Sequence, residues 1–167
     1  MDVRRLTEVF RRLGAHDPEG WARSQVEGGI PQLARFLFLR QAWRKIVPED
    51  DASWIDSSIA RSDAAPNEPY AGVGHALKRL RSLGAADDDL TDLVRGMQAS
   101  LLFDFCFLLE CAEDVEPEAA AVQWALYQLD EEGRPVDPVG GLHESVLEMD
   151  PTGREMTPRP RPQGHET

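Results

Sequence analysis

The amino-acid sequence predicts an all-α protein: a single compact bundle of about five to seven helices, followed by an irregular, Pro-rich C-terminal segment. Three observations lead to this fold class. Apolar residues recur at helical spacing along most of residues 1–133. Asp, Pro and Gly signals stand where these stretches begin and end. From residue 134 onward the chain is rich in Pro and Gly, so residues 134–167 are expected to pack in part and then become flexible.

Three helices are expected within the first 46 residues. Apolar spacing predicts the first over residues 3–13. Asp17 is a good N-cap and Pro18 suits the first helical position, so a second helix begins there and ends at Gly28. The third helix, residues 31–46, is apolar nearly all round, which is typical of a largely buried central helix.

The middle of the chain predicts two shorter helices around a loop. Asp50 or Asp51 can cap a helix that carries Trp54, and residues 62–69 are expected to form a loop because they are polar and contain two prolines. The next helix ends at Gly84. Its apolar stripe is predicted to consist of Tyr70, Val73, Leu77 and Leu80.

A long apolar helix over about residues 88–110 is predicted to cross the 31–46 helix at the centre of the fold. Pro117 is expected to open a last helix that ends at Gly133. A small hairpin within residues 122–136 is the alternative, and the helix is preferred. One short helical turn is expected near 142–148.

Charge is distributed unevenly along the chain, which has 18 Lys and Arg, 30 Asp and Glu, and a net charge of −12. Residues 1–46 contain 9 basic and 5 acidic residues, whereas residues 47–167 contain 9 basic and 25 acidic residues. Such acidity repels the phosphates of nucleic acid and the anionic surface of membranes, so neither is expected as a partner. A basic protein partner or a second copy of the chain is compatible with it.

The sequence also bears on location and chemistry. The N-terminus has no signal-peptide pattern, no apolar run is long enough to span a membrane, and two cysteines at 106 and 111 suit a reducing cytoplasm.

No phosphate loop, nucleophile elbow or paired-cysteine zinc motif is present, and Gly72-Val-Gly74 lacks the third glycine of a dinucleotide cradle. We therefore expect no cofactor and no metal, and the chain is more plausible as a binding protein than as an enzyme.

Two histidine–carboxylate pairs are the weak candidates for a catalytic site. His143 and Glu144 follow two glycines, where the imidazole ring could enter a cleft. His16 and Asp17 form a similar pair in a loop, although helix capping already explains Asp17.

Asp104 interrupts an otherwise apolar stretch of the long helix. A buried carboxylate without a partner costs several kcal/mol, so Arg40, which interrupts the other central helix, is its predicted ion-pair partner. The alternative is that Asp104 points outwards from a narrow exposed strip.

Acidic and aromatic residues form the candidate partner-binding set. The carboxylates come from two helix starts, where capping and solvation also explain them. Trp43 and Trp124 are expected in the core, while the other two tryptophans could line a groove. The candidate partner-binding residues are Glu49, Asp50, Asp51, Asp56, Asp87, Asp88, Asp89, Asp92, Trp21 and Trp54.

Two classes of function follow from these observations. The first is a small acidic cytoplasmic interaction protein, of the adaptor, chaperone-like or immunity type, that blocks or carries a basic partner. The second is an enzyme or small-ligand-binding domain with an inter-helical pocket that uses His143 and Glu144.

Overall fold

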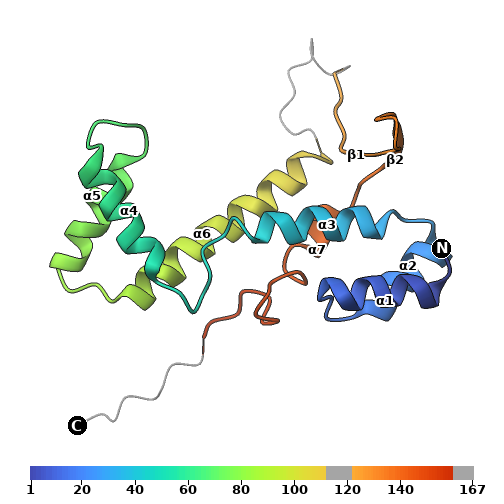
Figure 1. Cartoon of the computed structure of the whole chain (residues 1–167), viewed down its shortest axis with the longest axis horizontal. Helices are drawn as coiled ribbons and strands as arrows, with labels where there is room; N and C mark the ends of the chain where they lie inside the picture. Colours follow the sequence, from blue (N-terminus) through green and yellow to red (C-terminus); the bar gives the residue numbers. More distant parts are fainter. Residues whose placement is uncertain (112–121, 160–167) are drawn as a thin grey trace, which may run out of the picture. The chain divides into compact units, whose positions relative to one another are not determined.

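The computed structural model describes residues 1–111 and 122–159, and it confirms the predicted all-α class (Figure 1). The described residues form seven helices and one two-stranded sheet. The helices are α1 (Val3–Leu13), α2 (Pro18–Gly28), α3 (Gln32–Trp43), α4 (Ser53–Ala64), α5 (Ala71–Ser82), α6 (Asp87–Leu108) and α7 (Leu142–Ser145), and the strands are β1 (Tyr127–Leu129) and β2 (Pro135–Pro138).

The chain divides into two units. The first joins Met1–Arg40 to Phe105–Thr167, and the second is Gln41–Asp104. The boundaries between them therefore fall within α3 and within α6. The predicted boundary after residue 133 separates a helical domain from a Pro- and Gly-rich segment and does not coincide with either of these two boundaries. It stays a prediction.

The first unit is built on an aromatic cluster between α1, α2 and α3. The rings of Phe10, Trp21 and Phe36 pack against one another, and the Phe10–Phe36 and Trp21–Phe36 pairs meet edge to face with centroids 5.3 Å apart. Leu6 and Ala22 complete the buried cluster. The start of α2 follows the predicted signal, because Asp17 accepts a hydrogen bond from the Gly20 N–H at 2.9 Å. At the start of α1, Asp2 accepts one from the Arg5 N–H at 2.8 Å.

The second unit depends on close packing of α4 against α5. A Cβ at Gly74 would lie 2.2 Å from the Ser62 hydroxyl oxygen and 2.3 Å from the Ser58 carbonyl oxygen, so only glycine fits this contact. Ser62 is buried, and its hydroxyl donates to the Ser58 carbonyl. The helix α4 continues to Ala64, where a loop was expected from residue 62.

The apolar stripe predicted for α5 is right for Leu77 and wrong for its other three members. The buried residues of α5 are Ala71, Gly74 and Leu77, whereas the predicted members Tyr70, Val73 and Leu80 are exposed. The physical reason is that small side chains let α4 approach closely, and spacing of large side chains carries no information about such a contact.

The preferred helix after Pro117 is also wrong where the structure describes the chain, and the hairpin alternative is right. β1 and β2 pair antiparallel (Figure 1), and residues 117–121 lie outside the described part. Asp130 accepts hydrogen bonds from the Glu132 and Arg134 backbone N–H groups, and Gly133 adopts a φ of 80°. An aspartate that caps a tight turn, followed by a glycine with positive φ, forms a reversal that no helix can contain.

The two central helices are less completely buried than predicted. In α3, Phe36, Leu39 and Trp43 are buried, but Leu37 is exposed. In α6 the apolar residues Leu93, Met97, Leu101, Phe105 and Leu108 are all exposed. Trp124, expected in the core, is exposed as well, and its indole N–H donates to the Leu108 carbonyl at 2.8 Å.

The C-terminal segment is organised around a buried carboxylate. Asp150 accepts hydrogen bonds from the Thr152 hydroxyl at 2.8 Å and from the Met156 N–H at 3.0 Å. Residues 150–156 therefore form a closed turn in which Met156 has a φ of 61°. Of the tail that was expected to be mobile from about residue 156, residues 160–167 lie outside the described part.

Candidate functional site

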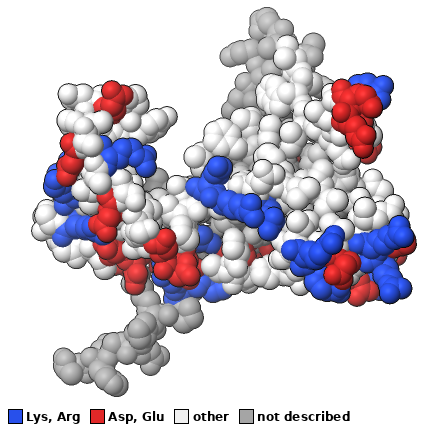
Figure 2. Space-filling model, viewed as in Figure 1, with Lys and Arg blue, Asp and Glu red and all other residues white. Residues whose placement is uncertain are grey.

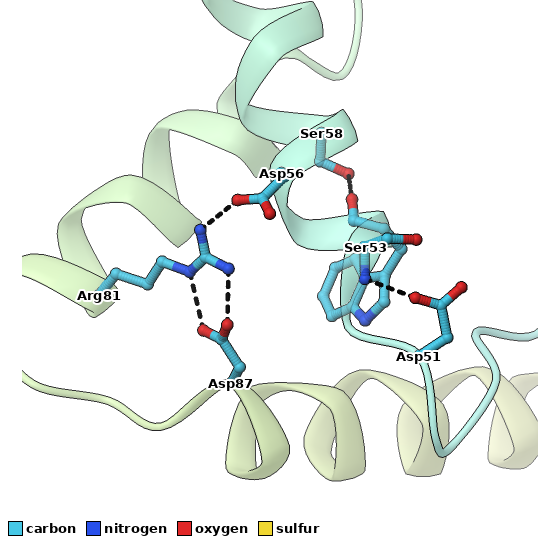
Figure 3. A network of polar contacts seen from close by, with 7 residues as sticks. Asp51, Ser53, Asp56, Ser58, Arg81 and Asp87 are labelled. Carbon is cyan, nitrogen blue, oxygen red and sulfur yellow. Dashed lines mark hydrogen bonds and ion pairs between the residues drawn. The ribbon is translucent and has the colours of Figure 1, made fainter.

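Two of the predicted acidic residues, Asp56 and Asp87, meet at Arg81 in the second unit. Arg81 stands at the end of α5, Asp56 in the first turn of α4, and Asp87 at the first position of α6. The Arg81 Nε and Nη2 atoms donate to the two Asp87 carboxylate oxygens at 2.8 and 2.7 Å, and Nη1 donates to Asp56 (Figure 3). One guanidinium thus joins two helix starts that are 31 positions apart in the chain.

The electrostatics of this group are dominated by the ion pair. Hydrogen bonds from Arg81 hold the pKa of the Asp87 carboxyl below its usual value, and the same contacts raise the pKa of Arg81. Two carboxylates surround a single cation, so the group keeps a net negative charge. Its side chains are partly or largely exposed, and a solvated pair of this kind contributes less to stability than to the local field.

Other carboxylates extend this acidic surface. Asp51 accepts a hydrogen bond from the Ser53 N–H at 2.8 Å, and its hydrogen bonds with Ser53 lower its pKa (Figure 3). Asp50, Asp88 and Asp89 are exposed near the same two helix starts. We call the set of Asp50, Asp51, Asp56, Asp87, Asp88 and Asp89 the acidic surface. Figure 2 shows acidic side chains interleaved with basic ones on this unit, and many basic side chains over α1.

The tryptophans assigned to partner binding have structural contacts. Trp21 is buried in the aromatic cluster of the first unit. Trp54 is half-buried against the Ile55–Leu77–Leu90 core, and its indole N–H donates to the Thr91 hydroxyl at 3.1 Å. Both observations favour core packing over the groove-lining role considered from the sequence.

Asp104 is exposed, which is the alternative that the sequence left open. Arg40 is half-buried, and it belongs to the first unit while Asp104 belongs to the second. The predicted ion pair between them stays a prediction, but the large cost of burying Asp104 no longer supports it.

His143 is half-buried, but its carboxylate neighbour is Glu110 and not Glu144. The His143 Nδ1 atom lies 3.4 Å from a Glu110 oxygen, and the imidazole ring meets Phe107 edge to face at 5.2 Å. Glu144 is exposed. Glu110 was missed from the sequence because it follows the apolar helix by only two residues and resembles an ordinary polar helix end.

Glu110 holds the start of α7 in place. Its two oxygens accept hydrogen bonds from the N–H groups of Gly141, at 2.7 Å, and of Leu142. Gly141 has a φ of 68°, and a Cβ there would lie 2.0 Å from the Arg35 guanidinium. Arg35 is itself buried and donates to the Ser145 hydroxyl at 3.3 Å. Glu110 therefore fixes the backbone at residues 141 and 142, and Arg35 holds the Ser145 side chain.

The remaining candidates have simple placements. His16 and Asp17 are exposed, and Asp17 acts as the N-cap of α2. Cys106 is buried and Cys111 is exposed, and both are free thiols. Across residues 1–111 and 122–159, no three His, Cys, Asp or Glu side chains are grouped so that they could hold a metal ion.

Comparisons with protein-family models, with curated proteins and with solved structures found no match to this chain. None of the helices in the described residues combines the length and the apolar character that crossing a membrane requires. The class that the fold defines is a small all-α protein, and its function has to be argued from its own surfaces.

Proposed function

We propose that this chain is a cytoplasmic protein-interaction protein that binds a partner with a basic surface through its acidic surface. The observation that supports this proposal is the bridge from Arg81 to Asp56 and Asp87, because it brings the acidic starts of α4 and α6 together. A field of one sign steers an oppositely charged partner and raises the rate of association.

The chain satisfies part of its acidic excess internally. Asp56 and Asp87 share Arg81, and Asp63 pairs with Lys78 at 2.8 Å. The charge available to a partner is therefore smaller than the total of −12 suggests. Asp50 and Asp88 are the best candidates to meet a partner's cations, since both are exposed and neither takes part in an ion pair within the described residues.

The test is capture of a partner on the immobilised full chain from native lysate. We expect a basic protein to be retained at about 50 mM salt and released at a few hundred millimolar, because salt screens solvent-exposed charges. An Asp50→Lys/Asp88→Lys variant should lose this partner. A Glu131→Lys/Glu144→Lys variant makes the same change in charge in the other unit and should keep it. Retention by both variants, or no basic partner at low salt, would contradict the proposal.

A ligand-binding or enzymatic role for His143 is the second candidate. It is supported by the half-buried imidazole beside the Glu110 carboxylate. It is weakened because both Glu110 oxygens already accept backbone hydrogen bonds. The measurement is the His143 ring resonance by NMR during titration with small-metabolite mixtures. A shift that Glu110→Gln abolishes would favour this role.

A further inference from the structure

One face of α6 exposes large apolar side chains in a line. Leu93, Met97 and Leu101 are 58%, 66% and 54% exposed, and each follows the last by four residues. Residues at this spacing lie on one side of a helix, about 40° apart around its axis. The three anchors span about 12 Å along the helix. An exposed apolar line of this length is typical of a surface that another protein covers.

Carboxylates stand at both ends of this line. Asp89 precedes Leu93 by four residues, which places it about 40° from Leu93 around the axis. Asp104 follows Met97 by seven residues and Leu101 by three, which places it about 20° from Met97 and about 60° from Leu101. Both are exposed. They are about 22 Å apart along the helix. We call Asp89, Leu93, Met97, Leu101 and Asp104 the α6 docking face, and all of them belong to the Gln41–Asp104 unit.

The single cation of α6 is turned away from this face. Arg95 is 4% exposed, and its guanidinium carbon lies 5.1 Å from the centre of the Trp43 ring. It also donates to the Val47 carbonyl at 3.0 Å. Arg95 follows Leu93 by two residues, which places it on the opposite side of the helix. The residues that α6 contributes to the docking face are therefore apolar and acidic only.

We propose that the α6 docking face binds an amphipathic helix of a partner protein, which carries apolar residues in its middle and Lys or Arg near both ends. This inference rests on the proposed function and names the form that the basic partner takes. The apolar side of the partner helix covers Leu93, Met97 and Leu101, and its terminal cations pair with Asp89 and Asp104. Apolar anchors at helical spacing are how one helix recognises another.

Charge complementarity selects this occupant over a second copy of the chain. Parallel pairing of two α6 helices would place Asp104 beside Asp104, and antiparallel pairing would place Asp89 near Asp104 of the other copy. Like charges would meet in either case, and α6 itself brings no exposed cation to the contact because Arg95 is buried. An anionic membrane surface would be repelled by the same carboxylates.

The test uses three synthetic 18-residue peptides and the full chain. The first peptide has Leu at helical spacing and Lys near both ends, the second replaces each Lys with Glu, and the third scrambles the first. Binding is measured by fluorescence anisotropy at low and moderate salt. We expect the Leu/Lys peptide to bind at least about tenfold more tightly than either control peptide, and more weakly as salt rises.

Variants of the full chain then test whether the Leu/Lys peptide binds at the α6 docking face. Met97→Ser/Leu101→Ser should weaken the Leu/Lys peptide by about tenfold or more, because it removes two central anchors. Leu83→Ser, which changes an 82% exposed leucine outside α6, should have no effect. Asp104→Lys should weaken the Leu/Lys peptide and strengthen the Leu/Glu peptide. Circular dichroism of each variant checks that the helices are retained.

The outcomes separate this inference from the proposed function. If Asp50→Lys/Asp88→Lys abolishes peptide binding while Met97→Ser/Leu101→Ser does not, the acidic surface binds the basic ligand and the docking of a helix on α6 is overturned. If none of these variants weakens binding, both proposals fail. If ultracentrifugation shows a dimer that Met97→Ser/Leu101→Ser dissociates, the occupant is a second copy and the inference is wrong.

Discussion

Arg81 and Asp87 are joined by two parallel hydrogen bonds across the turn between α5 and α6, at 2.8 and 2.7 Å. The turn contains Gly84, whose φ of 89° lets the chain reverse within a few residues. The same guanidinium reaches Asp56 in α4. A single side chain thus connects three helices of the second unit and brings together two of the carboxylates that we assign to the acidic surface.

The Arg81–Asp87 pair predicts a pH dependence of stability. The pKa of Asp87 is lowered from 3.8 in the folded chain, so its ionised form stabilises the fold above that pH. This contribution is lost as the pH falls below 3.8 towards the lowered pKa. We therefore expect Asp87→Asn to lower Tm at pH 7 and to have little effect at the acid end of the titration. Thermal unfolding of both proteins against pH measures this difference.

The matched control for that experiment is Asp88→Asn, which removes the same charge at the next position, where Arg81 makes no contact. Its effect on Tm should be smaller. A Tm difference for Asp87→Asn that stays constant down to strongly acid pH would show that ionisation is not the cause.

Gly74 is expected to be intolerant of even a methyl group. In Gly74→Ala the new Cβ would meet the Ser58 carbonyl, which is backbone and cannot rotate away, so we expect a loss of about 1–3 kcal/mol. Gly72→Ala, in the same helix but with open space around the Cβ position, should leave stability unchanged or slightly raised. Urea unfolding of the two variants gives the comparison, and equal effects would refute close packing of α4 on α5.

Glu110 is expected to stabilise the segment that follows β2. Glu110→Ala leaves the Gly141 and Leu142 N–H groups without their acceptor, which costs about 1–3 kcal/mol. Hydrogen exchange at residues 141 and 142 should accelerate in this variant. Glu144→Ala, at an exposed position, serves as the control and should change neither quantity. Unchanged exchange in Glu110→Ala would show that another group holds these amides.

The two cysteines should differ in reactivity. Burial raises the pKa of the Cys106 thiol to about 11, with a smaller contribution from Glu110, so almost none of it is thiolate at pH 8. Cys111 is exposed. Iodoacetamide at pH 8 should therefore label Cys111 in the native protein and Cys106 only after unfolding. Peptide mass spectrometry measures both, and rapid labelling of Cys106 in the native state would contradict its burial.

The sequence by itself determined the helical class and most helix starts. Asp17 and Pro18 act within one turn of the backbone, and local interactions of this kind can be predicted from a few neighbouring residues. It also identified the acidic residues of both helix starts, because charge is a property of each residue and needs no partner.

Only the tertiary structure decided which surfaces these helices present. Large apolar residues predicted α6 as a central core helix, yet Leu93, Met97 and Leu101 are exposed. Small residues behave in the opposite way: Gly74 has no apolar side chain, yet it is buried where α4 and α5 pack closely. Hydrophobic spacing shows that a side chain prefers burial, but whether another element lies over it depends on contacts between residues far apart in the chain. For the same reason Glu110, and not Glu144, is the neighbour of His143, and Arg81 joins Asp56 to Asp87.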